Sequence, residues 1–549
     1  MTTYEFSNGK PKAEGMLSQG IEQGVWKFYD IKGFVVQEVT YKDGEFHGPF
    51  TSFYPDGKKK EEGNFDYNHV HGAFKTYNPD GFLESQGFYT FGLRDSLWTI
   101  YNSFGTKYSS GYYENDERVG IWETWYPDGG VKSKIDYTGK EAKMLKFWDT
   151  KGNVLLEDGN GRFEDYYFNG KRKESGAYKD GLKTGSWSAY NVEGIQISEG
   201  SFKEGKKDGI WVTFHDNGKP ANTGNYGNDL RQGPWMFYYD NGQQSKSVLY
   251  KNGKENGPYT EWFSTGEKSH QGSFLDGKKS GHWTWWFKDG RLDFEGDFAN
   301  NERHGKWIFY WPDVEKIEYT GTFTEGKKTG KWTYYYRDGI TWKFGNYVDG
   351  KKEGKWIIYA ENGNKVMEGS FVKGKEDGIW MSWYDDSSRK SEGSFKAGKM
   401  DGHWIGWFEN GQVNFEGTYA EGLKTGLWNH YYPNGNQELS QEFKEGIPHG
   451  MRTYYYENGN KKEEGNYTEG SKTGAWTFYW ENGKKEVECI FVANRQDGKV
   501  VSYHEIGTLE SIKYLKNGQP QGTWEFYGKR EGDLLRKVKY KDGQVVTEE

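Results

Sequence analysis

The chain is 549 residues long and contains 78 glycines, one cysteine, 18% aromatic residues and only 33% hydrophobic residues in total. This aromatic content excludes a disordered chain, and the shortage of aliphatic residues excludes the large core of an α/β enzyme of this length. The formal net charge of −8 lacks the cationic surplus of a nucleic-acid-binding protein, so we expect no nucleic acid partner.

The cysteine content and the N-terminal residues bear on the compartment. A single cysteine, Cys489, excludes an intrachain disulfide framework and is compatible with a reducing compartment. Residues Met1–Phe6 carry neither the basic nor the apolar region of a signal peptide, and no run of 18 apolar residues occurs. We therefore expect a cytoplasmic protein.

A short motif, Gly-x-aromatic, recurs every 24 residues along most of the chain. The copies that keep the glycine begin at Gly24, Gly48, Gly72, Gly120, Gly161, Gly185, Gly209, Gly233, Gly257, Gly281, Gly305, Gly330, Gly354, Gly378, Gly402, Gly426, Gly450, Gly474, Gly498 and Gly522. The copy at Ser96-Leu97-Trp98 lacks the glycine, and a degenerate copy lies at Met144–Trp148. Together they make about 22 units, so the chain is a repeat protein.

Each unit is predicted to form a β-hairpin. In the unit that begins at Gly402, Asn410-Gly411 separates two aromatic-rich runs, and Glu421-Gly422 separates this unit from the next. Asn-Gly and Asp-Gly pairs supply the positive φ angles of tight hairpin turns. Turns about 12 residues apart leave strands of about five or six residues, and no segment of the array is typical of a long helix.

An isolated hairpin is marginally stable, so each unit must pack on the next. The sequence predicts an all-β protein, an elongated and twisted single-ribbon array of about 22 stacked hairpins. The repeat spacing divides it into residues 1–136, N-terminal repeats; 137–161, a degenerate repeat whose shortened arm can bend the ribbon; 162–497, regular repeats; and 498–549, degenerate capping repeats.

Two aromatic positions recur within the unit. Tryptophan occupies the third motif position in most copies, and a second aromatic follows three residues later, as in Trp307 and Tyr310. We predict that the tryptophans of neighbouring hairpins lie in line with stacked rings, and that the odd spacing puts the second aromatic on the opposite face. The tryptophan face is the better candidate for the buried face because this position accepts fewer polar replacements.

The complete unit reads G-x-W-x-x-aromatic-aromatic-x-[DN]-G…E-G-x-[FY]-x-x-G-K-x-x-G, which resembles the MORN repeat. The form is similar to the variant repeat of bacterial proteins of the YwqK antitoxin family, and the likeness covers about residues 4–545. The resemblance implies a hairpin array, and the family name implies neutralisation of a protein toxin. Other MORN proteins are scaffolds or associate with membranes, and the repeats carry no catalytic residues to transfer.

The position two residues after the tryptophan varies freely among copies, which indicates that packing does not dictate it. Consecutive large copies occur at Trp285, Phe309, Tyr334 and Ile358. On a regular strand this position shares the face of the tryptophan, so the four residues would form an apolar stripe. This stripe is our candidate partner-binding site, and the alternative is that it is a thicker part of the core.

Other patterns do not support catalysis. The eleven histidines form no HExxH motif, no glycine-rich phosphate loop occurs, and acidic pairs such as Asp385-Asp386 lack a matched partner. We therefore expect no enzymatic activity, catalytic residue, metal or cofactor. Segments such as Gly326-Lys327-Lys328 indicate either a basic edge for lipid headgroups or solvated lysines that protect strand edges. Cys489 is expected to be a small buried residue.

The sequence predicts a non-enzymatic scaffold that binds another protein. A narrower alternative is a YwqK-like antitoxin or immunity protein whose partner is a toxin. A second alternative, from another class, is a scaffold that binds membrane lipid or carbohydrate, although the net charge of −8 does not favour lipid.

Overall fold

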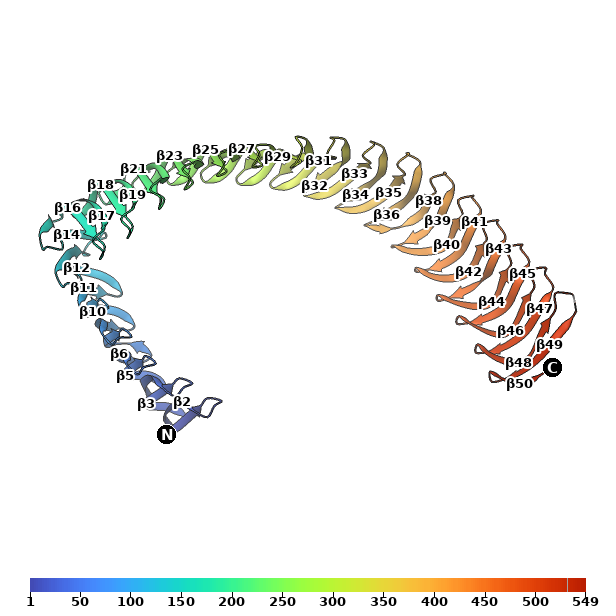
Figure 1. Ribbon diagram of the computed structural model, residues 1–549, viewed down its shortest axis with the longest axis horizontal. Coiled ribbons are helices and arrows are strands. Elements are labelled where there is room, and N and C mark those ends of the chain that lie inside the picture. The colour runs from blue at the N-terminus through green and yellow to red at the C-terminus, as the bar shows by residue number, and fades with distance from the viewer. Residues whose placement is uncertain (531) are drawn as a thin grey trace. The chain divides into compact units, whose positions relative to one another are not determined.

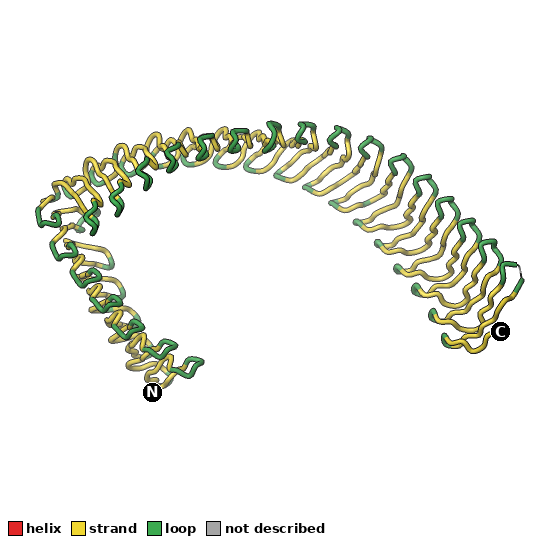
Figure 2. The backbone as a smooth tube through the Cα atoms, in the orientation of Figure 1, coloured by secondary structure: helices red, strands yellow, loops and turns green. Residues whose placement is uncertain are grey.

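A computed structural model describes residues 1–530 and 532–549, and in them every regular element is a β-strand. The chain divides into two units, Met1–Glu267 and Lys268–Glu549. Within each unit, the strands pair antiparallel in chain order, as the tube in Figure 2 makes visible. At three places a strand is interrupted, and its two segments pair with the same preceding strand. The predicted all-β hairpin array is therefore confirmed.

The first unit contains strands β1 to β25, and Figure 1 labels many of them. Their bounds are β1 Thr2–Glu5, β2 Pro11–Ser18, β3 Ile21–Tyr29, β4 Val35–Lys42, β5 Glu45–Phe53, β6 Lys59–Asp66, β7 His69–Val70, β8 Gly72–Tyr77, β9 Leu83–Thr90, β10 Leu93–Tyr101, β11 Lys107–Glu114, β12 Glu117–Trp125, β13 Val131–Asp136, β14 Lys143–Trp148, β15 Val154–Glu157, β16 Asn160–Tyr166, β17 Arg172–Lys179, β18 Leu182–Tyr190, β19 Gln196–Lys203, β20 Lys206–Lys207, β21 Gly209–Phe214, β22 Pro220–Gly227, β23 Leu230–Tyr238, β24 Gln244–Lys251 and β25 Lys254–Trp262.

The second unit contains strands β26 to β50. Their bounds are β26 Lys268–Leu275, β27 Lys278–Trp286, β28 Leu292–Ala299, β29 Glu302–Tyr310, β30 Ile317–Thr324, β31 Lys327–Tyr335, β32 Thr341–Val348, β33 Lys351–Tyr359, β34 Lys365–Val372, β35 Lys375–Trp383, β36 Arg389–Lys396, β37 Lys399–Met400, β38 Gly402–Trp407, β39 Val413–Ala420, β40 Leu423–Tyr431, β41 Gln437–Lys444, β42 Ile447–Tyr455, β43 Lys461–Thr468, β44 Ser471–Tyr479, β45 Lys485–Val492, β46 Arg495–Tyr503, β47 Leu509–Lys516, β48 Gln519–Tyr527, β49 Leu534–Lys541 and β50 Gln544–Glu548.

Two kinds of turn alternate along the array. At Glu421-Gly422 both residues have positive φ, 51° and 86°, which makes a two-residue turn of the mirror-image type favoured in hairpins. At Asn410-Gly411 only Gly411 has positive φ, and the loop is longer, closed by a hydrogen bond from the Phe408 amide to the Gln412 carbonyl (2.8 Å). The Asn-Gly and Asp-Gly pairs therefore mark turns as predicted, but the tightest turns lie between units.

The tryptophan face is the buried face, as predicted. Eight tryptophan side chains are less than 2% exposed: Trp26, Trp122, Trp235, Trp283, Trp307, Trp332, Trp428 and Trp476. The second aromatic lies on the opposite face, where the Tyr310 hydroxyl donates to the Glu295 carboxylate (2.9 Å).

Successive tryptophans do not stack directly on one another, so that part of the prediction is wrong. Phe323 lies between Trp307 and Trp332, with ring centroids 5.8 and 5.1 Å away and interplanar angles of 78° and 89°. Edge-to-face contact of this kind is favoured because the positive edge of one ring meets the negative face of another. The buried column thus alternates tryptophan with the Phe or Tyr of the Glu-Gly-x-[Phe/Tyr] segment.

Each buried tryptophan ring lies on a glycine eleven residues earlier in the chain. A Cβ atom added to Gly321 would lie 2.1 Å from Cδ2 of Trp332, and the indole N–H of Trp332 donates to the Thr322 carbonyl (3.2 Å). Where the tryptophan position holds Val500, the residue eleven earlier is Cys489, which is buried. The glycine and the tryptophan are thus replaced together in this repeat, and the sequence alone contains this covariation.

The repeat shortened at residues 137–161 still forms a hairpin. Strand β14 is paired with the four-residue strand β15, and Phe147 and Leu156 are almost fully buried against Phe163 and Trp187. The shortened arm therefore keeps the buried column continuous within the first unit.

Candidate functional site

The candidate stripe lies on the tryptophan face of the second unit, as its spacing predicts. Trp285, Phe309 and Tyr334 belong to β27, β29 and β31, and the intervening strands β28 and β30 contribute Phe294 and Tyr319 between them. We call these five residues the aromatic row. Phe294 and Tyr319 were not predicted, because they occupy a second motif position that only cross-strand pairing brings beside the first.

Rings of the aromatic row stack on one another. Successive centroids, from Trp285 to Tyr334, are 4.5, 5.7, 4.3 and 5.5 Å apart, with interplanar angles of 23° to 33°. Phe309 is 9% exposed and belongs to the core cluster around Trp307 and Trp332, whereas Trp285 and Tyr334 are half-buried. The row therefore presents ring edges, rather than ring faces, to solvent.

Ile358 does not join the aromatic row. Lys343 of β32 stands opposite both Tyr334 and Ile358, so it separates the two. The structure thus brings together three of the four predicted stripe residues. Whether the stripe binds a partner stays a prediction.

A column of cations runs beside the aromatic row. The charged groups of Arg303, Lys328 and Lys352 lie 4.7, 4.0 and 4.8 Å from the ring centroids of Trp307, Trp332 and Trp356 respectively. We call these three residues the cation column. The second lysine of a Gly-Lys-Lys segment is therefore packed on a tryptophan face, which corrects the interpretation of both lysines as solvated edge protection.

The cation column has no carboxylate within ion-pair distance among the described residues. Burial, and then the nearby charge of Arg303, lower the pKa of Lys328. Burial, and then Lys352 and Lys328, lower the pKa of Lys343. Lys328 and Lys343 therefore lie close to other cations and to the rings of Trp332 and Tyr334.

Two carboxylates flank the aromatic row. Burial raises the pKa of Asp293. Burial, and then the charge of Asp293, raise the pKa of Glu318, and both carboxylates act on the Tyr319 hydroxyl. The charge of Arg303 acts on the same hydroxyl in the opposite direction, so both signs of charge lie near Tyr319.

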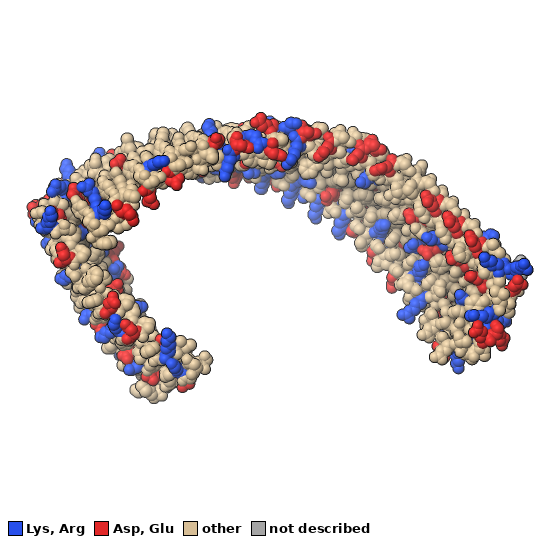
Figure 3. Space-filling view, viewed as in Figure 1, with Lys and Arg blue, Asp and Glu red and all other residues tan. Residues whose placement is uncertain are grey.

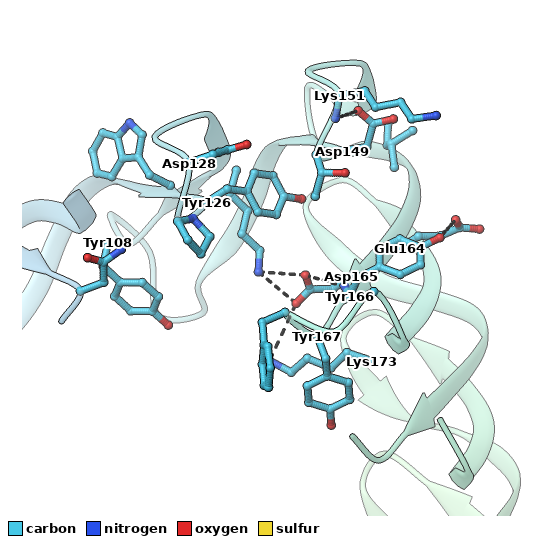
Figure 4. A pocket seen from close by; sticks show the side chains of 18 of the residues that line it. Tyr108, Tyr126, Asp128, Asp149, Lys151, Glu164, Asp165, Tyr166, Tyr167 and Lys173 are labelled. Atoms are coloured by element: carbon cyan, nitrogen blue, oxygen red, sulfur yellow. Dashed lines mark hydrogen bonds and ion pairs between the residues drawn. The ribbon is translucent and has the colours of Figure 1, made fainter. Parts of the chain in front are cut away.

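A pocket of about 940 Å³ opens in the first unit at the shortened repeat. Figure 4 shows Asp165 at its centre, where Lys132 Nζ lies 2.9 Å from Asp165 Oδ1 and Lys173 Nζ lies 3.8 Å from Asp165 Oδ2. Asp165 is 6% exposed, and Tyr126 closes one wall by donating to the Trp148 carbonyl (2.8 Å). The ion pair joins β13 to β16 across the short hairpin β14–β15, so we call Lys132 and Asp165 the latch.

No group of three or more His, Cys, Asp or Glu side chains in residues 1–530 and 532–549 could hold a metal ion. Cys489 is buried, as predicted, and burial raises the pKa of its thiol, which disfavours the nucleophilic thiolate. In the part of the chain that the structure describes, there is also no helix long and apolar enough to cross a membrane.

A second apolar row lies on the face opposite the tryptophans in the first unit. Phe88, Leu97, Tyr112 and Ile121 come from the successive strands β9 to β12 and are 50%, 46%, 53% and 42% exposed. Leu97 and Tyr112 are directly opposed, and Leu97 and Ile121 each precede a buried tryptophan-face residue. We call these four residues the reverse-face row. Sequence could have located it, because large apolar residues stand immediately before Trp98 and Trp122 and again ten residues before each of them.

Charged side chains are mixed over much of the surface. Figure 3 shows acidic and basic residues interleaved along the visible face of each unit. Many form cross-strand pairs, such as Lys27 with Glu38 (3.0 Å) and Lys134 with Glu123 (2.7 Å). Exposed pairs of this kind contribute little stability. The cation column differs from this common pattern because its members have no such partner among the described residues.

The fold and its buried column define a β-hairpin repeat protein. The family model described as the MORN repeat variant matches residues 46–67, 118–138, 207–228, 352–373, 400–421, 448–469 and 472–493. The repeats of this chain are therefore of the MORN variant type at these seven segments. No curated protein matches the chain.

Two solved structures have low similarity to this chain. The Photorhabdus luminescens Tc holotoxin pore is 11% identical, with a TM-score of 0.14, over 93% of this chain and 27% of that chain. The TcdB2–TccC3 structure is 10% identical, with a TM-score of 0.13, over 95% of this chain and 31% of that chain. The present chain thus spans about a third or less of these chains, and the TM-scores are too low to define a shared fold.

Proposed function

We propose that this protein is a non-enzymatic, cytoplasmic repeat scaffold that binds another protein. The observation that carries the proposal is the reverse-face row, where four large apolar side chains from adjacent strands are about half exposed. Contiguous apolar residues of this size, with aromatic members, are typical of protein interfaces. The repeat architecture adds support because stacked units provide an extended surface on rigid strands.

The test compares two serine variants in affinity purification from the source cells. One variant carries Phe88→Ser, Leu97→Ser, Tyr112→Ser and Ile121→Ser. The control carries Ile379→Ser, Leu427→Ser and Met451→Ser, which are 60%, 51% and 41% exposed but do not form a row on adjacent strands. We expect specific partners to be lost only with the first variant. Equal recovery by both variants and the parent, with both variants folded by circular dichroism, would refute the proposal.

A narrower function is that of a YwqK-like antitoxin or immunity protein. It is supported by the MORN variant segments and by the resemblance of the unit to repeats of that family. Co-expression with a toxic product of a neighbouring gene tests it. Growth rescue by the parent, lost in the reverse-face variant, supports this function, and failure to rescue any neighbouring product opposes it.

Lipid or carbohydrate binding has weaker support. The lysines that pack on tryptophans do not project as a flat basic surface, and the faces of the aromatic row are covered by neighbouring rings. A sugar ring stacks on a free aromatic face, and anionic lipids are attracted by clustered exposed cations. Both alternatives therefore rank below protein binding.

A further inference from the structure

The cation column provides positive charge in single file. Arg303, Lys328 and Lys352 come from β29, β31 and β33, so one cation stands on every second strand. Strands are about 4.8 Å apart, which places successive cations roughly 9.6 Å apart. Each cation rests on a buried tryptophan, so its position is fixed by packing before any ligand arrives.

The aromatic row lies within reach of these charges. Lys328 Nζ is 3.2 Å from the Tyr334 hydroxyl, and the Arg303 guanidinium carbon is 5.7 Å from the centroid of Phe309. The charges of Arg303 and Lys328 therefore adjoin the ring edges in one surface. We call it the cation–aromatic surface, made of the cation column and the aromatic row.

The carboxylates of Asp293 and Glu318 restrict how an anion could lie on this surface. They interact with Tyr319, a member of the aromatic row, and they have no ion-pair partner among the described residues. Negative charge on a ligand is attracted by the cation column and repelled by these two groups. The surface thus favours a ligand with one acidic side and one apolar side.

We propose that the cation–aromatic surface binds an acidic polyproline II segment of a partner protein, with a carboxylate at every third residue. This inference rests on the proposed protein-binding function. A polyproline II helix has three residues per turn and a rise of about 3.1 Å per residue, so every third side chain recurs on one side after about 9.3 Å. That repeat matches the roughly 9.6 Å spacing of the cations. Proline-rich helices also dock on aromatic residues, and their preformed shape reduces the entropy lost on binding.

Other occupants fit less well. An extended β-strand places residues i and i+3 on opposite sides, so it cannot present acids to successive cations at this spacing. Single-stranded nucleic acid binds through bases stacked on free aromatic faces, but here each ring face is covered by the next ring. A membrane presents a plane of headgroups, whereas the cations form one line.

Fluorescence anisotropy on the full chain can test the proposal. The probe is a labelled peptide of four Glu-Pro-Pro triplets. One control peptide has the same composition with its four glutamates consecutive, and the other has four Lys-Pro-Pro triplets. We expect at least about tenfold weaker binding of the first control, no binding of the second, and weaker probe binding at higher salt because the contact is ionic.

Matched protein variants locate the binding. Arg303→Gln, Lys328→Gln and Lys352→Gln together should weaken probe binding at least about tenfold. The control changes Lys183→Gln, Lys207→Gln and Arg231→Gln, which hold the same motif position over Trp187, Trp211 and Trp235 in the first unit. These cations adjoin no aromatic row, so the control should bind the probe as the parent does.

Several results would overturn the proposal. They are absence of probe binding, equal binding of the peptide with consecutive glutamates, an equal loss in both glutamine variants, or tighter binding of oligo-dT or of vesicles containing phosphatidylserine. If the second-unit variant does not fold, the binding of the three peptides to the parent protein still decides between these outcomes. The reverse-face variant should bind the probe as the parent does. Loss of the cation–aromatic site and loss of the proposed scaffold function are therefore detected by separate experiments.

Discussion

The pairing of a glycine with a tryptophan eleven residues later can be tested as a thermodynamic coupling. Trp428 is 1% exposed, packs against Tyr419 (ring centroids 4.8 Å apart), and lies so close to Gly417 that an added Cβ would be 2.2 Å from Trp428 Cδ2. A larger residue at Gly417 must displace the ring, and overpacking of this kind destabilises by about 1–3 kcal/mol. Trp428→Val removes the ring and should destabilise the unit by about 3–5 kcal/mol.

The chain itself contains the replacement pair. Cys489 and Val500 occupy the same two positions in a later repeat, and both are buried. We therefore expect Gly417→Cys combined with Trp428→Val to destabilise less than the sum of the two single changes, by about 1–3 kcal/mol. The physical reason is that the cysteine side chain occupies the volume that the ring vacates.

Hydrogen exchange of the amides in 413–431, together with thermal melting, measures this coupling. Local exchange is the sharper measurement because a repeat array opens unit by unit. The control is Gly426→Ala, where φ is 64° and an added Cβ meets no atom within 4 Å, so its effect comes from the backbone alone. Its effect should add to that of Trp428→Val. If the effects of Gly417→Cys and Trp428→Val are also additive, the proposed ring-on-glycine packing is refuted.

Three further predictions concern the latch, the flanking carboxylates and the repeat length. Asp165→Asn should destabilise the first unit by up to about 3 kcal/mol, which is less than for a fully buried ion pair because Lys132 is partly exposed. Amide hydrogen exchange should become faster in β13–β16 only. Unchanged exchange in these strands would show that the latch does not hold the short hairpin. Burial raises the pKa of Glu318, so its ionisation opposes folding, and the free energy of unfolding falls as the pH rises above the ordinary pKa of a carboxyl group. Glu318→Gln should therefore slow local amide hydrogen exchange at neutral pH but not below about pH 4. An equal effect at the two pH values would contradict this pH dependence. Deletion of residues Gly378–Asp401, one whole unit of 24 residues, should leave a folded array, whereas deletion of 12 residues should disrupt pairing of the flanking hairpins; circular dichroism and melting would show equal damage if the repeat interpretation is wrong.

Local features of the fold follow from sequence alone. The 24-residue period, the turn residues and the identity of the buried face are encoded within single units, since turn geometry and side-chain alternation depend on neighbours along the chain. The position of Trp285, Phe309 and Tyr334 on the tryptophan face could be predicted for the same reason. Their association with Phe294 and Tyr319 could not be read from one motif position, because it arises from pairing between strands.

Only the tertiary structure shows in which register the strands of neighbouring units pair. In β30–β31 the register shifts between Thr320 and Thr322, so that Trp332 comes to lie on Gly321 while Lys328 folds back over the ring. At this shift, residues 330–332 of β31 stand opposite the single residue Gly321 of β30. The positive φ of Gly330 allows the backbone to form this bulge. The sequence by itself determined which residues turn and which face is apolar, because these depend on local conformation. Only the assembled strands determined the ring-on-glycine packing, the cation column and the latch, because each joins residues whose separation depends on the cross-strand register.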